Sequence, residues 1–183
     1  MDGDLFFWIL ARVCGLSAFA ALSISLLTGA ALRTAVLDWL ATNRVLRSVH
    51  EFSAVLWIPL GLLHVAALVL DRTARISITD LVIPFQVHYP SVPQATLAIG
   101  LGTVTLELFV VVAITGWLKL RIAVGVWQWI HRLSYLAFAL LFLHAVLSGS
   151  DFSDPTVSAL TWAVAFVLGI ISLARVLWGR LPA

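Results

Sequence analysis

Five long apolar stretches, separated by short polar connections, dominate the pattern of the chain. Each stretch is long enough to cross the hydrocarbon core of a bilayer, which takes about 20 residues as an α-helix. Apolar runs of this length with so few charges predict transmembrane helices rather than core helices of a soluble domain. The predicted spans are approximately 5–31, 47–70, 94–119, 126–148 and 156–177.

Composition leads to the same class of protein. The 183 residues are 62% hydrophobic and 11% charged, whereas a soluble domain would carry roughly twice that charge. The longest connection, about 71–93, is too short for a folded domain. We therefore expect an all-α integral membrane bundle of five transmembrane helices, a single domain over residues 1–183 with the lipid bilayer as its surroundings. The sequence contains no glycine-rich phosphate-binding motif. It also has no basic arm, so no nucleic-acid partner is expected.

The charged residues predict an orientation. Connections 32–46 and 120–125 are positively charged, and Arg175 and Arg180 add to the C-terminal end, whereas the remaining connections and the N-terminus are neutral or acidic. Because positive connections stay in the cytoplasm, we expect the N-terminus outside and the C-terminus in the cytoplasm. The opening "MDGDLFFWIL" lacks the basic region of a signal peptide, so the first span is expected to be retained.

Four histidines lie within two of the spans. His50 and His64 are fourteen residues apart in the second span, and His131 and His144 are thirteen apart in the fourth. These spacings correspond to roughly 21 Å and 20 Å along a helix axis. Since alternating crossings make the two spans parallel, His50 can face His131 near the cytoplasmic side and His64 can face His144 near the outer side. On ideal helices the first pair is about 40° apart and the second about 140°. Either the fourth span is locally overwound or tilted, or the two rings are rotated relative to each other.

Two level pairs of imidazoles fit an iron porphyrin better than a bare metal ion. Zinc would need three or four ligands at each level, and the sequence offers two. A haem supplies four nitrogens of its own, so two axial histidines complete each site. A single histidine in a membrane helix is usually a packed, hydrogen-bonded residue, but polar residues in lipid are costly, and four at matched spacings favour ligation. No C-x-x-C-H motif is present, which excludes covalent c-type attachment.

Further residues are candidates for the surroundings of the haems. Trp57 and Phe138 lie seven residues past the inner histidines on the same helix stripes, where core packing and an electron relay are both open. Gly61 would let a ring edge approach the backbone. Arg47 and Arg132, beside the inner pair, could neutralise haem propionates.

Three polar residues keep alternative interpretations. Arg12 in the first span could pair with an outer propionate or extend towards the headgroups. Glu107, near the middle of the third span, could be protonated packing, a partner of Arg12, or part of a proton or quinol site. His88 in the 71–93 connection is either a surface histidine or a contact for an electron acceptor.

The segments "RSVHEFSAVLWIPLGLLH" and "WQWIHRLSYLAFALLFLH" resemble the two ligand helices of the ferric reductase-like transmembrane domain. That family includes the membrane parts of ferric reductases and NADPH oxidases. The segments "LFFWILARVCGLSAFAALSISLLTG" and "DLVIPFQVHYP" look like its small bacterial members. The resemblance implies a protein with two haem b groups that moves electrons across a bacterial plasma membrane, with the inner haem on His50 and His131 and the outer haem on His64 and His144.

The chain also departs from that family. Ferric reductases and NADPH oxidases append a cytoplasmic FAD and NADPH domain, which is missing from this sequence, so a separate flavoprotein or a membrane quinol would be the electron donor. The haem subunit of bacterial methionine sulfoxide reductase is also a stand-alone bundle, but it has an additional span and a different ligand arrangement. A haem sensor, carrier or assembly subunit with the same ligands is the main alternative. A third interpretation is a transporter with a polar relay through Glu107 and the histidines. The sequence lacks the paired broken helices that are expected of many transporters.

Overall fold

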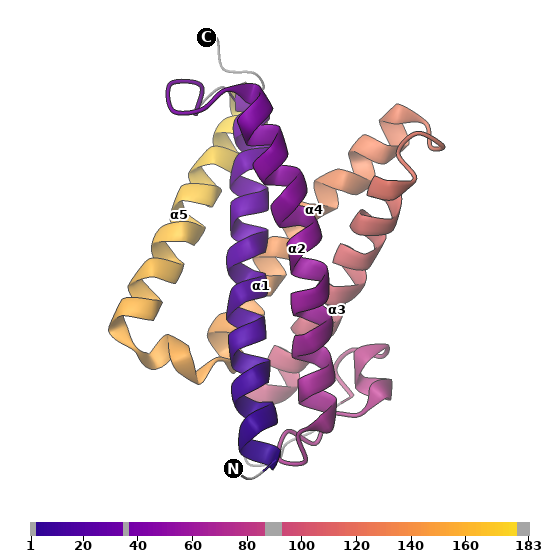
Figure 1. The fold of residues 1–183 in the computed structure, drawn as a ribbon, viewed down its shortest axis with the longest axis vertical. Coiled ribbons are helices and arrows are strands. Elements are labelled where there is room, and N and C mark those ends of the chain that lie inside the picture. The colour runs from indigo at the N-terminus through magenta and orange to yellow at the C-terminus, as the bar shows by residue number, and fades with distance from the viewer. Residues whose placement is uncertain (1–2, 35–36, 87–92, 179–183) are drawn as a thin grey trace. The chain divides into compact units, whose positions relative to one another are not determined.

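The computed structural model describes residues 3–34, 37–86 and 93–178. Within them the chain forms five α-helices and two short 3-10 helices, with no strand (Figure 1). His88 lies outside the described residues. The elements are α1 (Gly3–Thr34), α2 (Asn43–Leu70), η1 (Ile78–Leu81), α3 (Pro93–Trp117), α4 (Val124–Ser148), η2 (Ser150–Ser153) and α5 (Pro155–Trp178).

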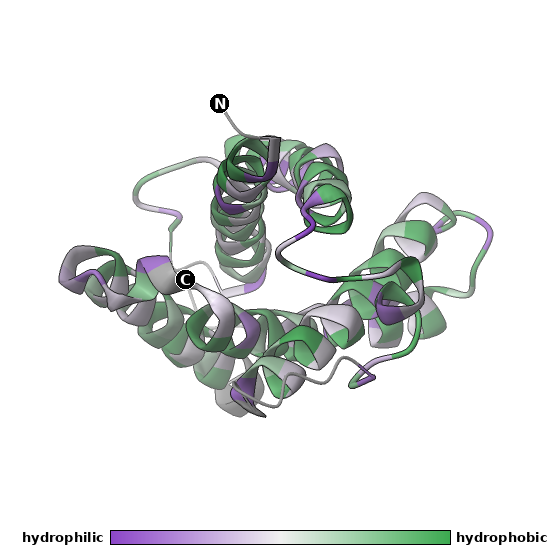
Figure 2. Ribbon diagram, turned by 90° about the horizontal axis from the view of Figure 1, so that it is seen from below, coloured by the Kyte–Doolittle hydropathy of each residue, from purple (hydrophilic) through white to green (hydrophobic). Residues whose placement is uncertain are grey.

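Each of the five α-helices in the described part of the chain is long and apolar enough to cross a membrane. Apolar colouring predominates along the helices in Figure 2. The predicted all-α fold is thereby confirmed for the described residues, with five helices long and apolar enough to span a membrane. The largest difference from the expected bounds is at the start of α2, which begins at Asn43 because the Thr42 hydroxyl caps it and accepts the Val45 N–H at 3.4 Å.

The chain divides into two compact units. Unit 1 comprises Met1–Arg75 and Pro155–Ala183 and contains α1, α2 and α5, whereas unit 2 comprises Ile76–Asp154 and contains α3 and α4. Each unit is built on a pair of consecutive helices in contact, α1 with α2 and α3 with α4. The single domain expected over residues 1–183 stays a prediction.

Small residues dominate the buried side of α1. They are Ala11, Cys14, Ala18, Ala21, Ala30 and Ala31. On α2 the buried small residues include Ser53 and Ala67. Membrane helices associate without a hydrophobic driving force, so small residues that let backbones come close are typical of their interfaces. This composition allows α1 and α2 to pack side by side over most of their length (Figure 1).

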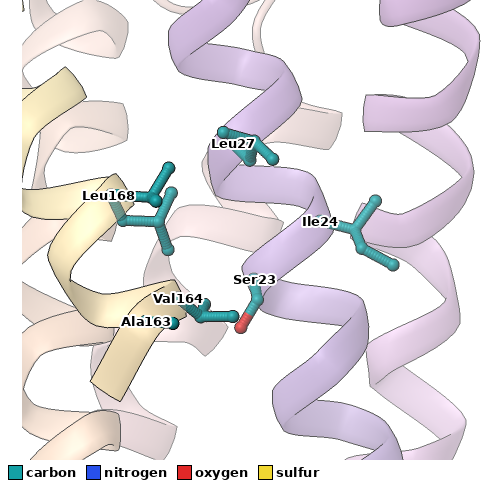
Figure 3. Close-up of a pocket in the computed structure, with 7 residues that line it drawn as sticks. Ser23, Ile24, Leu27, Ala163, Val164 and Leu168 are labelled. Carbon is teal, nitrogen blue, oxygen red and sulfur yellow. The ribbon is translucent and has the colours of Figure 1, made fainter. Parts of the chain in front are cut away.

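In unit 1, α5 packs against α1. A hollow of about 260 Å³ lies between them, with Ser23 and Leu27 of α1 and Val164 and Leu168 of α5 among its lining residues (Figure 3). The Ser23 hydroxyl donates to the Phe19 carbonyl at 2.8 Å, so its hydrogen bond stays within α1. The hollow therefore presents an apolar wall, as expected for helices surrounded by lipid.

The connection before α3 is fastened to that helix. The Asp80 carboxylate accepts hydrogen bonds from the Ser77 N–H at 2.8 Å and from the Ser77 hydroxyl at 2.6 Å, which holds η1 together. The Thr103 hydroxyl of α3 donates to the Asp80 carbonyl at 2.7 Å. A Cβ at Gly100 would collide with the ring of Phe85. Glycine at this position thus lets the connection lie against α3.

Two neighbouring alanines at the end of α2 test this packing. Ala67 is buried at 1% exposure and Ala66 is exposed. We expect Ala67→Leu to lower the free energy of unfolding by about 1–3 kcal/mol, because an enlarged side chain at a packed position forces its neighbours apart. Ala66→Leu is the matched control and should change it by less than about 0.5 kcal/mol. Unfolding of the two purified variants in detergent micelles measures the difference, and equal effects would contradict the described packing.

Candidate functional site

The four histidines predicted as ligands all lie on described helices. His50 and His64 are on α2 of unit 1, and His131 and His144 are on α4 of unit 2. All four side chains are half-buried. Three of them share one hydrogen-bonding arrangement within their own unit.

In unit 1, both histidines bond to the main chain of α1. The Nδ1 atom of His64 lies 2.7 Å from the carbonyl oxygen of Ala11, and that of His50 lies 2.8 Å from the carbonyl oxygen of Ser25. A carbonyl oxygen only accepts hydrogen bonds, so Nδ1 of each ring must carry the proton and donate. In the neutral imidazole, the lone pair available to a ligand is then on Nε2.

Two hydroxyl groups surround the His50 contact. The Thr28 hydroxyl donates to the same Ser25 carbonyl at 3.1 Å and to the Ile24 carbonyl at 2.7 Å. The Ser25 hydroxyl lies 3.2 Å from the His50 Nδ1 and donates to the His50 carbonyl at 3.5 Å. The ring is therefore held by a polar group of its neighbour helix rather than by apolar packing alone.

In unit 2, His144 repeats the arrangement on α3. Its Nδ1–H donates to the carbonyl oxygen of Ala98 at 2.8 Å. The ring of His131 stacks on that of Trp127, one turn earlier in α4, with 5.2 Å between ring centroids and 21° between the planes.

A glycine stands four residues after each of the three acceptor carbonyls. In an α-helix the carbonyl of residue i points towards residue i+4, so a side chain there would stand beside the oxygen. A Cβ would lie only 2.8 Å from the histidine Nδ1 at Gly15, 3.0 Å at Gly29 and 2.7 Å at Gly102. Glycine is the residue that lets the imidazole reach the carbonyl. We call each such acceptor and its glycine a carbonyl–glycine pair.

These contacts meet one requirement of a histidine that binds a metal, a hydrogen bond at its other ring nitrogen. A metal-binding histidine usually donates its other ring N–H to a carbonyl or carboxylate, which fixes the tautomer and the ring orientation. Three of the four predicted ligands have this partner. The Trp127 Nε1–H beside His131 is buried and has no hydrogen-bond partner among the described residues, so it could donate to an anionic oxygen such as that of a propionate. The residues present therefore fit haem.

The two aromatic residues and the glycine predicted beside the haems lie within the helices, and both aromatic side chains are buried. Trp57 and Phe138 are buried, at 9% and 5% exposure. A Cβ at Gly61 would lie 3.3 Å from the Trp57 indole, so the ring that approaches this glycine is that of Trp57. Their contribution to a haem site stays a prediction.

The charged residues predicted near the haems lie beside tryptophans or are exposed. The guanidinium of Arg12 lies 4.0 Å from the Trp8 ring centroid, and that of Arg132 lies 5.0 Å from the Trp129 ring centroid. Arg47 is exposed, as is Glu107 on α3. Their proposed bonds to propionates stay predictions, as does a proton or quinol site at Glu107.

Gly15, Gly29 and Gly102 were not expected from sequence as site residues. The sequence nevertheless contains a signal that could have identified two of them. Gly15 and Gly29 are fourteen residues apart, as are His50 and His64. Because α1 and α2 are antiparallel neighbours, the equal spacing of the two glycines and the two histidines brings each glycine to the depth of one histidine.

Comparisons of the chain with protein-family models, curated proteins and solved structures find no match. In the described residues, no group of three or more His, Cys, Asp and Glu side chains is placed to hold a metal ion. The motifs of the chain and the geometry of its histidines are therefore the observations that bear on its function.

Substituting the glycine of a pair should displace the histidine. We expect Gly102→Ala to lower the free energy of unfolding by about 1–3 kcal/mol, because the methyl group pushes the His144 ring off the Ala98 carbonyl. Gly169→Ala in α5 is the control, since a Cβ there meets nothing within 4 Å. Unfolding in detergent, together with ¹⁵N spectra of labelled histidine reporting the Nδ1–H tautomer, measures both effects. An unchanged His144 resonance in Gly102→Ala would contradict the described contact.

Proposed function

We propose that the protein is a b-type dihaem membrane protein that transfers electrons across the bilayer in the manner of ferric reductases. The donor is a cytoplasmic flavoprotein or a membrane quinol, and the acceptor lies on the outer side. The chain is oriented with its N-terminus outside and its C-terminus in the cytoplasm of a bacterial cell, in agreement with its distribution of positive charge.

One observation carries the proposal. Three of the four histidines at matched spacings donate Nδ1–H to a helix carbonyl next to a glycine. A histidine kept only for packing needs a partner for one nitrogen, but it has no need for the same nitrogen, the same kind of acceptor and a glycine each time. The repeated arrangement gives each of the three rings the tautomer that an axial ligand needs.

The spacings assign the ligands to two haems. His50 and His131 are the proposed ligands of the inner haem, and His64 and His144 those of the outer haem. In unit 1 the two carbonyl contacts are fourteen residues apart on both α1 and α2, which supports two ligand levels separated by roughly 21 Å.

The remaining residues are proposed to orient the histidine rings and to bind the haem propionates. Each carbonyl holds its imidazole in place and increases the basicity of Nε2. Arg12, Arg47 and Arg132 are proposed to neutralise propionates, and Trp127 to donate its indole N–H to one of them. When bound, haem supplies reversible one-electron chemistry. Two histidine ligands for each haem would leave its iron no free position, so the acceptor would be reduced by electron transfer rather than by binding to the metal.

Haem content gives the first test. Protein produced with ample haem should contain two haems per chain in a pyridine haemochrome assay. His64→Ala and His144→Ala should each lose one haem, as should His50→Ala and His131→Ala, because one axial ligand is removed from one site. Gln94→Ala, at an exposed position at the start of α3, is the control and should keep two. Wild-type protein without haem would end the proposal.

Reoxidation kinetics separate electron transfer from haem sensing, haem carriage or an assembly role. Protein reduced with dithionite in vesicles should be reoxidised rapidly by a ferric chelate added on the outer side. Slow reoxidation together with ready release of haem to apomyoglobin would favour the sensor or carrier. Reoxidation that requires a sulfoxide-reducing partner protein would instead assign the chain to a sulfoxide reductase system.

A further inference from the structure

Unit 2 carries a glycine that repeats the pattern of unit 1 without a described histidine contact. Gly116 follows Gly102 by fourteen residues on α3, as Gly29 follows Gly15 on α1. Gly15, Gly29 and Gly102 all belong to carbonyl–glycine pairs. The question is whether the carbonyl four residues before Gly116, that of Val112, is a fourth acceptor.

The hydrogen bonds around Val112 match those around Ser25, the acceptor of His50. A threonine precedes each glycine, in "LTG" and in "ITG". The Thr28 hydroxyl donates to the Ile24 carbonyl at 2.7 Å and to the Ser25 carbonyl at 3.1 Å. The Thr115 hydroxyl donates to the Val111 carbonyl at 2.7 Å and to the Val112 carbonyl at 3.1 Å. This local similarity is independent of the glycine spacing.

Depth along the helix pair points to His131. The helices α3 and α4 are consecutive and in contact, and the His144 bond to Ala98 fixes their register. Fourteen residues further along α3 is Val112, and thirteen residues back along α4 is His131. A difference of one residue is about 1.5 Å of axial rise. Val112 and His131 are therefore at nearly the same depth.

We propose that Val112 and Gly116 are positioning residues for the inner haem, with the Val112 carbonyl accepting the His131 Nδ1–H and Gly116 making room for the ring. This inference rests on the proposed haem ligation and deepens it, since it completes one carbonyl–glycine pair for each of the four ligands. Val112 and Gly116 act through His131 and touch no reacting atom.

The arrangement requires His131 to leave its stack on Trp127 when it serves as a ligand. His131 and His144 are thirteen residues apart, whereas His50 and His64 on α2 are fourteen apart. This difference of one residue turns the Cβ of His131 about the helix axis by about 100° relative to the arrangement on α2. Exchange between staggered χ1 rotamers moves a ring through about 120°, so a change of rotamer is of the size needed to compensate. In the described structure a Cβ at Gly116 meets no atom within 4 Å, which leaves space beside the Val112 carbonyl.

The Gly116→Ala variant separates the two arrangements. If His131 stays stacked on Trp127, the added methyl group meets open space and the variant should behave as wild type. If His131 bonds to Val112, the methyl group meets the ring, as it would at Gly102 and Gly29. We expect Gly116→Ala to lose the haem that His131→Ala loses, or to shift its low-spin EPR signal, with the other haem unchanged.

Matched variants complete the experiment. Gly29→Ala is the positive control, because its Cβ lies 3.0 Å from the His50 Nδ1, and Gly169→Ala is the negative control. Haem-to-protein ratio, low-temperature EPR and the thermal midpoint are measured for all three variants. A thermal midpoint equal to that of Gly169→Ala shows that the Gly116→Ala chain folds.

The outcomes distinguish this inference from the proposed function. Two haems with wild-type EPR signals in Gly116→Ala would overturn the inference and leave dihaem ligation standing. Wild-type protein without haem would overturn both. Loss or perturbation of the inner haem alone in Gly116→Ala and Gly29→Ala supports the assignment.

Discussion

The hydrogen bond from an imidazole N–H to a helix carbonyl is the constraint on which the histidine arrangement depends. A polar side chain within a membrane helix is expensive unless it has a partner, and the backbone of a neighbouring helix is already bonded within itself. A carbonyl oxygen has two lone pairs, so it can accept the imidazole and keep its own helical bond. The obstacle is steric, and glycine at position i+4 removes it. His50, His64 and His144 are all held in this way.

The helices could be predicted from sequence because hydrophobic length alone decides whether a segment spans a bilayer. Their ends depend on local chemistry that hydropathy does not record. The polar start of α2 at Asn43 follows from the Thr42 cap, and α3 ends at Trp117 although the apolar residues continue to Leu118. The division into two compact units was not expected either, since an apolar pattern shows which residues face a neighbour but not which helix that neighbour is.

The histidines of the candidate site were found by their spacing, and the glycines were missed for a physical reason. A glycine in an apolar span has many possible explanations, and its role becomes apparent only when the facing side chain is known. Gly61, which was expected to admit a ring edge, faces Trp57 of its own helix, whereas Gly15 faces His64 of the next one. Helical periodicity alone cannot separate these cases. Equal fourteen-residue intervals on consecutive spans could have done so.

The two contacts between α1 and α2 also have a mechanical consequence. Sliding α2 by one residue, or turning it by one position, would move both imidazoles from a glycine to a residue with a side chain, at two depths simultaneously. The helix pair is thereby locked against translation and rotation. Under the proposed function, haems held by this pair would keep a constant separation. Because electron tunnelling slows steeply with distance, the transfer rate would then be insensitive to thermal motion of the surrounding lipid.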